Sequence, residues 1–203
     1  MGRIALIGAS GNVGSRILNE LSDRGHQVTA IARTPEKIPS LPGVTTVKGD
    51  LADAAGLAAL LEGHDAIVSS VKFLDTDFDQ LLRAVRASGV KRYLVVGGAG
   101  SLEVAPGKHL VDQPEFPDQY KNEALKGAEF LDILKTAYDL DWTFLSPSAL
   151  FVPGERTGKF RLGKDALLTT ENGSSISFED YAIAMVDEIE EPKHIRQRFT
   201  VGY

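Results

Sequence analysis

The chain has 203 residues, a length typical of one domain or of one domain with a small appendage. It carries 28 acidic and 22 basic residues, and the resulting net charge of −6 argues against nucleic acids and anionic membranes as partners. The absence of cysteine excludes disulfides, thiolate metal sites and cysteine nucleophiles. No apolar run approaches a membrane span and the first residues already read as a strand, so we expect a cytoplasmic protein.

The first half of the chain alternates short apolar runs with amphipathic segments. Strands are expected at residues 3–7, 27–32, 44–48, 66–71 and 93–96, and helices at residues 12–24, 52–61 and 78–87. Apolar strands separated by helices indicate a parallel sheet that is covered on both faces. The sequence therefore predicts an α/β fold with a doubly wound parallel sheet, the Rossmann fold.

The second half is less regular. Residues 101–117 contain three prolines, and we expect them to form an ordered loop near a ligand. Further elements are expected as a helix at 119–138, a strand at 142–145, a short hairpin at 160–170, a helix at 178–189 and a strand at 199–201. We interpret residues 1–203 as one domain, in which about residues 150–203 form a small extension on the substrate side, over the strand ends.

A glycine-rich turn lies between the first strand and the first helix. Glycine allows the backbone to turn tightly and to approach a pyrophosphate, whose charge is then stabilised by the amides at the helix start. The turn reads Gly-x-x-Gly-x-x-Gly, with a serine where the usual fingerprint has its second glycine. The predicted phosphate-binding residues are Gly8, Ser10, Gly11, Asn12, Val13 and Gly14.

The end of the second strand bears on which nicotinamide cofactor is bound. An acidic residue there binds the free ribose hydroxyl of NAD, whereas an arginine accommodates the additional phosphate of NADP. Here the strand ends at Arg33, and no carboxylate follows until Glu36. Arg33 offers a guanidinium suited to a phosphate, and Lys37 can assist it, so we predict NADP(H). The alternative is that Arg33 is a solvated residue at a strand end.

Other cofactor contacts are expected where the remaining strands end, because ligands in such sheets lie across the carboxyl ends of the strands. Asp50 can accept a hydrogen bond from the adenine amino group, and Leu51 can pack on its ring. The residues Ser69, Ser70, Gly97 and Gly98 are expected beside the ribose and nicotinamide.

Several segments together resemble the atypical short-chain dehydrogenase/reductase group, akin to the NmrA-like and flavin-reductase-like families. The resemblance covers essentially the whole chain and rests on residues 8–14, Arg33, 49–51, 97–101, 140–147 and 176–182. It implies an NAD(P)-binding fold in which the last two segments are a sheet strand and a late helix over the cofactor. Such sequences are commonly labelled epimerases, dehydratases or reductases from the fold alone.

Reductases of the superfamily use a Tyr-x-x-x-Lys pair, which this chain lacks. Tyr120 begins the helix where the pair would be, with Lys121 next to it; Lys126 is six residues on, about 120° away around the helix. The serine that assists the tyrosine is replaced by glycine, and the nearest hydroxyl is that of Ser101. The candidate catalytic residues are Tyr120 as proton donor, Lys121 and Ser101. The alternative is that Tyr120 only lies at the rim of the site and that the lysines are solvated.

Three functions remain open at this point. The first is an NADP-dependent reductase of a small carbonyl, quinone or flavin-like substrate, with an apolar pocket formed by Phe73, Phe116, Tyr120, Leu150 and Phe151. The second is a non-catalytic NADP(H)-sensing regulatory protein. The third is a sugar-nucleotide epimerase or dehydratase, which usually needs the tyrosine base and a larger substrate domain. In all three we expect a monomer or homodimer, and the isolated histidines predict no metal site.

Overall fold

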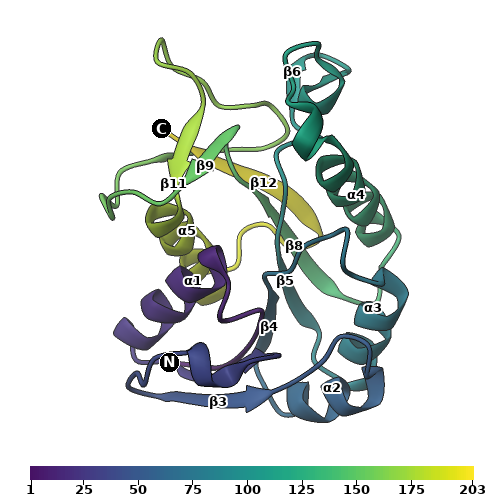
Figure 1. Cartoon of the computed structure of the whole chain (residues 1–203), viewed down its shortest axis with the longest axis vertical. Coiled ribbons are helices and arrows are strands. Elements are labelled where there is room, and N and C mark those ends of the chain that lie inside the picture. Colours follow the sequence, from purple (N-terminus) through teal and green to yellow (C-terminus); the bar gives the residue numbers. More distant parts are fainter.

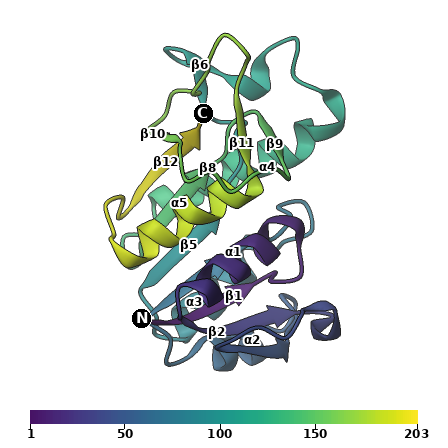
Figure 2. The same cartoon turned by 90° about the vertical axis from the view of Figure 1, so that its left-hand side faces the viewer.

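The computed structural model describes all 203 residues, and its centre is a sheet of eight strands with helices on both faces (Figures 1 and 2). The sheet is parallel except for one short edge strand, β10, which runs antiparallel to its neighbour. In spatial order the strands are β10 (Arg161–Gly163), β12 (Gln197–Gly202), β8 (Asp141–Ser146), β5 (Arg92–Val96), β4 (Ala66–Ser69), β1 (Arg3–Ile7), β2 (Gln27–Ala32) and β3 (Val44–Lys48).

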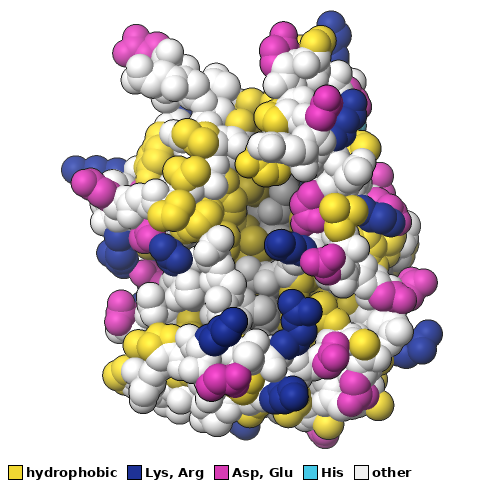
Figure 3. All heavy atoms as spheres, viewed as in Figure 1, with side chains coloured by type: hydrophobic (Ala, Val, Ile, Leu, Met, Phe, Trp, Pro, Cys, Tyr) yellow, Lys and Arg dark blue, Asp and Glu magenta, His cyan; other side chains and the backbone are white.

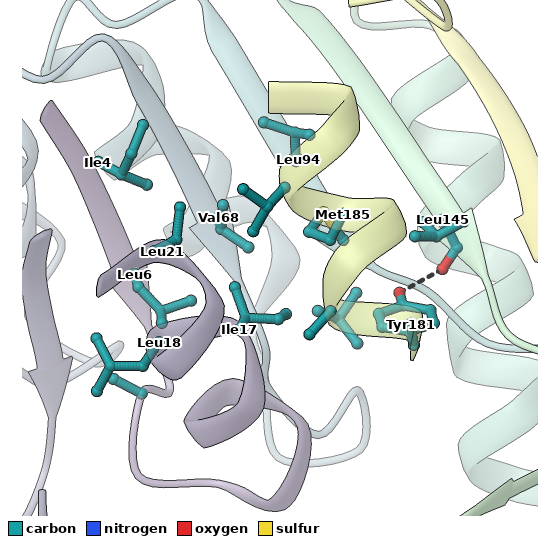
Figure 4. Close-up of a cluster of buried hydrophobic side chains, with 14 of the residues drawn as sticks. Ile4, Leu6, Ile17, Leu18, Leu21, Val68, Leu94, Leu145, Tyr181 and Met185 are labelled. Carbon is teal, nitrogen blue, oxygen red and sulfur yellow. Dashed lines mark hydrogen bonds between the residues drawn. The ribbon is translucent and has the colours of Figure 1, made fainter. Parts of the chain in front are cut away.

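Two helix layers enclose the sheet. Helices α1 (Asn12–Asp23) and α5 (Phe178–Glu190) pack on one face, and α2 (Ala54–Leu61), α3 (Phe78–Ala87) and α4 (Asp118–Lys135) pack on the other. Because successive strand residues point to opposite faces, Ile4 and Leu6 contact the α1 and α5 layer while Ala5 and Ile7 contact the other layer. Figure 4 shows the first of these cores, in which the Tyr181 hydroxyl donates to the Leu145 carbonyl at 2.7 Å. None of the five helices is long and apolar enough to cross a membrane.

Polar side chains fix where three of the helices begin. Asp53 accepts a hydrogen bond from the Gly56 amide at the start of α2, and Asp77 accepts one from the Gln80 amide at the start of α3. Ser177 does the same for α5. These side chains satisfy amides that have no partner within the helix.

The strand and helix predictions for the first half are confirmed, with small differences at the ends: the fourth strand ends at Ser69, and α2 begins at Ala54. Residues 101–117 include two short strands that pair, β6 (Glu103–Ala105) and β7 (Lys108–His109). The remaining short elements are η1 (Pro35–Lys37), η2 (Leu110–Asp112), β9 (Leu150–Val152) and β11 (Ser175–Ser177).

The predicted hairpin at residues 160–170 is wrong. Its first arm is β10, and it pairs with β12, so that Leu162 lies opposite Val201. Residues following the turn bond elsewhere: Asp165 accepts from the Glu103 amide at 2.8 Å, and Leu167 donates to the Glu103 carbonyl at 2.9 Å. The local pattern indicated a turn correctly, but the two arms have different partners that are distant in sequence.

A buried ion pair connects α5 to the sheet. The Glu188 carboxylate lies 3.0 Å from the Arg92 guanidinium, and it also accepts hydrogen bonds from the His194 amide and from the His194 ring. Burial lowers the pKa of Arg92 from its ordinary value, and the attraction of Glu188 opposes this change. The arginine also donates to Thr143 on β8 at 2.6 Å. Through Arg92 and His194, the Glu188 carboxylate therefore connects α5 to β5 and to the segment before β12.

Glu188→Gln should lower the free energy of unfolding by about 3 kcal/mol, because the substitution leaves the buried Arg92 cation without its counter-charge. Denaturant unfolding followed by circular dichroism measures this change. Glu191→Gln is the matched control, since Glu191 pairs with Lys193 where both side chains are exposed, and we expect a loss below about 1 kcal/mol. Equal losses in the two variants would contradict the assignment.

Candidate functional site

The candidate site lies where the order of the sheet reverses. Strand β1 has β2 and β3 on one side and β4 and β5 on the other, and ligands of doubly wound sheets bind outside the strand ends at such a point. Two cavities open there, of about 410 Å³ and about 1000 Å³. Figure 3 shows the hollow at the centre of this face, with hydrophobic side chains gathered along its upper wall and Lys and Arg side chains below it.

The glycine turn forms the floor between the two cavities. Gly8 has a φ of 79°, and a Cβ atom there would overlap the Ser70 carbonyl oxygen. At Gly14, a Cβ atom would overlap the carbonyl oxygen of Gly8. Any larger residue at either position would force the turn to move, which explains why this sequence needs glycine at both.

Helix α1 begins with free donors. Its first residue is preceded by Gly11, no side chain caps the helix, and the amides of Asn12, Val13 and Gly14 have no acceptor in the protein. No acidic residue lies in the first turn. Free amides and the positive end of the helix dipole together favour a bound anion.

The smaller cavity has the features of an adenosine site. Six residues of the predicted cofactor site lie in its walls: Gly8, Ser10, Gly11, Arg33, Asp50 and Leu51. The Arg33 side chain is exposed and bonds to no protein group. Asp50 has one carboxylate oxygen committed to the Ala52 amide at 2.9 Å, which leaves the other oxygen for a ligand.

Three of the four residues expected beside the nicotinamide line the larger cavity. Ser70 lines both cavities, and Gly97 and Gly98 line the larger one. Ser69 lies outside both, because its buried hydroxyl is bonded to the Tyr93 hydroxyl at 2.7 Å. Burial raises the pKa of Tyr93 well above its ordinary value, so this pair is a neutral support beneath the strand ends.

The larger cavity is mainly apolar. Phe73, Phe116, Tyr120, Leu150 and Phe151 all line it, so the predicted apolar pocket is confirmed. These residues come from the segment after β4, the approach to α4, α4 itself and β9. The cavity adjoins the smaller one at Gly11 and at Ser70–Lys72, the residues that line both. Together the two cavities fit an elongated ligand with an anionic middle, which is the form of a nicotinamide dinucleotide.

The three candidate catalytic residues do not come together. Tyr120 lines the larger cavity with 59% of its surface exposed, whereas Lys121 lies outside both cavities. Ser101 also lies outside, and its hydroxyl oxygen accepts a hydrogen bond from Arg198 at 3.0 Å. Tyr120 is therefore the one member of the set that a substrate in this cavity can reach.

Lys72 and Glu123 are among the polar residues of the site that the sequence patterns did not predict. Lys72 lies three residues after the end of β4 and lines both cavities. Glu123 lines the larger one, and its carboxylate accepts hydrogen bonds from the amides of Phe73 at 2.7 Å and Leu74 at 2.9 Å. Position at a strand end could have indicated Lys72, but Glu123 carries no signal in the sequence, since its contact spans 50 residues.

The fold and the glycine turn define a dinucleotide-binding protein of the doubly wound class. Residues 8–192 match the NAD(P)H-binding family, and the chain belongs to that family. It is 40% identical to the uncharacterized protein YwnB of Bacillus subtilis over 98% of this chain and 97% of YwnB.

Solved structures agree with this assignment. A Burkholderia pseudomallei protein provisionally named as exported is 50% identical, with full coverage of both chains and a TM-score of 0.91. A Streptococcus pneumoniae protein provisionally named as an NADH-flavin reductase is 35% identical. The match covers 100% of this chain and 99% of the pneumococcal chain, with a TM-score of 0.83.

Gly14→Ala should weaken binding of nicotinamide dinucleotides about tenfold or more, because the added methyl group displaces the turn that presents the free amides. Isothermal titration with NADP⁺ and NAD⁺ measures the loss. Asn19→Ala is the control: Asn19 is exposed on the same helix and lines neither cavity, so cofactor affinity should stay within about threefold. Wild-type affinity in Gly14→Ala would refute this account of the turn.

Proposed function

We propose that this protein is an NADP(H)-dependent oxidoreductase that reduces a small carbonyl, quinone or flavin-like substrate. The observation that carries the proposal is the size and apolar lining of the larger cavity, which adjoins the nucleotide cavity at Gly11 and Ser70–Lys72. Its volume of about 1000 Å³ leaves space for a substrate beside the nicotinamide, which a protein that only stored or sensed the cofactor would not need.

Arg33 supports NADP over NAD as the cofactor. It lines the nucleotide cavity at the end of β2, and its guanidinium is not engaged by any carboxylate. A 2′-phosphate would find a bidentate donor there, whereas the ribose hydroxyl of NAD would find no acidic acceptor at the end of β2.

The walls of the larger cavity support a flat, apolar substrate. Phe73, Phe116 and Phe151 offer ring faces and edges, and Gly97 and Gly98 leave room at the backbone for a planar ring. When bound, the reduced cofactor would supply a hydride. Quinones and flavins accept hydride with little assistance by protonation, which suits a site that has no Tyr-x-x-x-Lys pair.

Tyr120 is the residue we assign to proton transfer. Its hydroxyl lies on the cavity wall at the start of α4 and bonds to no protein group, so it is available to a carbonyl oxygen of the substrate. The exclusion of Lys121 and Ser101 from the cavity leaves it without the usual partners. A reductase also needs a supply of reduced cofactor, which favours the cytoplasm as its location.

A second candidate function is an NADP(H)-sensing regulatory protein. The observation in its favour is the dispersed catalytic set, in which Ser101 is bonded to Arg198 and Lys121 points to neither cavity. Purified protein incubated with NADPH and a panel of quinones, flavins and aldehydes separates the two, with absorbance of the reduced nicotinamide as the readout. Turnover of any member supports the reductase. Tight NADPH binding without turnover would favour the regulator.

Arg33→Asp should weaken NADP⁺ binding about hundredfold and leave NAD⁺ binding within about threefold, since the new carboxylate repels the 2′-phosphate and can accept from a ribose hydroxyl. Isothermal titration with both cofactors measures the ratio. Lys48→Asp makes the same change in charge outside both cavities and should not alter preference. Equal losses for the two cofactors in Arg33→Asp would refute the assignment.

Tyr120→Phe should lower kcat for an aldehyde substrate about hundredfold, the usual contribution of a general acid, and leave the affinity for NADPH unchanged. Steady-state rates and a binding titration on the same preparation measure the two effects. Tyr138→Phe is the control, because that tyrosine is 78% exposed and lines neither cavity. An unchanged rate in Tyr120→Phe would remove the tyrosine from the mechanism.

A further inference from the structure

We propose that Lys72 holds the pyrophosphate of the cofactor from the side opposite the glycine turn. This inference rests on the cofactor part of the proposed function and does not depend on reductase activity. It assigns a role to the one cation that both cavities share.

The position of Lys72 along the bound ligand follows from how the cavities connect. The residues common to both linings are Gly11, Ser70, Val71 and Lys72. A dinucleotide with its adenosine in the smaller cavity and its nicotinamide in the larger one must pass this junction with its middle, which is the pyrophosphate. Next to Gly11 at this junction lie Asn12 and Val13, whose amides have no acceptor in the protein, and the segment Ser70–Lys72 after β4 supplies the other residues of the junction.

Charge supports the same placement. Lys72 is the only cation among the residues of the larger cavity, and only Arg33 accompanies it in the smaller one. The smaller cavity also contains the acidic residues Asp50, Asp75 and Asp77, which repel an anionic ligand. With a net charge of −6 on the whole chain, the site needs a cation at its centre to attract a pyrophosphate.

The Lys72 ammonium is free to take this role. The lysines that form ion pairs in this protein are Lys126, Lys135 and Lys193, so no carboxylate neutralises Lys72. Its nearest acidic neighbours in sequence are Asp75, which forms no ion pair with it, and Asp77, which caps α3 by accepting from the Gln80 amide. An ammonium group that lines a ligand cleft without a protein anion has its full charge to offer to a ligand.

The backbone that carries Lys72 is held on every side. The Ser70 amide donates to the Ile7 carbonyl at 2.9 Å, and the Lys72 carbonyl accepts from the Thr76 hydroxyl at 2.6 Å. The next two amides, of Phe73 and Leu74, donate to Glu123. Lys72 therefore extends from a fixed position, and binding does not have to pay for ordering its loop.

Ligand fragments separate this role from that of Arg33. In titrations of the full chain, Lys72→Met should weaken NADP⁺ and NAD⁺ equally, by about tenfold to hundredfold, since both contain the pyrophosphate. It should leave adenosine 2′-monophosphate, which lacks the pyrophosphate, unaffected. Arg33→Met is the matched control with the opposite pattern: weaker binding of NADP⁺ and of adenosine 2′-monophosphate, and unchanged binding of NAD⁺.

Folding and partial rescue are checked on the same variants. Methionine retains the apolar stem of the lysine, so the thermal unfolding midpoint of Lys72→Met should match that of the wild type, and Lys72→Arg should restore most of the lost affinity. Unchanged affinity for both cofactors in Lys72→Met would overturn the inference, as would an equal loss for adenosine 2′-monophosphate. If the wild type binds NADP⁺ but reduces nothing, the reductase proposal fails while these affinities still decide the role of Lys72.

Discussion

The close approach of three backbone segments at the start of α1 is the constraint on which the site depends. Gly8 lies against the Ser70 carbonyl and Gly14 against the Gly8 carbonyl, with no space for a side chain at either place. This contact brings the end of β1, the first turn of α1 and the segment after β4 together. It leaves the first amides of α1 without acceptors and directs them to the junction of the two cavities. Backbone packing therefore fixes the position of the free amides at which an anion can bind.

The segment from Ser70 to Thr76 connects the two halves of the site. Its first residues line both cavities, and its middle is bonded to Glu123 on α4. Phe73 is buried there against Phe130 and Phe144, with ring centroids about 6 Å apart. A change in how α4 packs would move this segment and so affect both cavities. Cofactor affinity and the shape of the apolar cavity are thus expected to vary together in substitutions along α4.

Most of the fold was accessible from the sequence because its signals are local. Apolar strands, amphipathic helices and the glycine turn each depend on residues within one or two turns of the chain, and the residues of the nucleotide cavity follow from strand ends. The features that the sequence did not predict depend on partners that are distant along the chain. The arms around Gly163 pair with β12 and with Glu103, and Glu123 reaches a loop 50 residues away. No pattern within the segment at 160–170 encodes these partners.

The hydrogen bond from Arg198 to Ser101 has a consequence for how this site could change. Arg198 is nearly buried on β12; besides Ser101 it bonds to Ser146 and to Asp165, so it joins the last strand to the segments on either side. The Ser101 hydroxyl, which is nearest to the position of the superfamily's catalytic serine, therefore has a structural role in this hydrogen bond. Recruiting Ser101 for chemistry would require an arginine to be replaced first, at a cost in stability. A new hydroxyl at Gly98, where an added Cβ would make only an ordinary contact of 3.7 Å with Phe73, would be the shorter route to a serine-assisted enzyme.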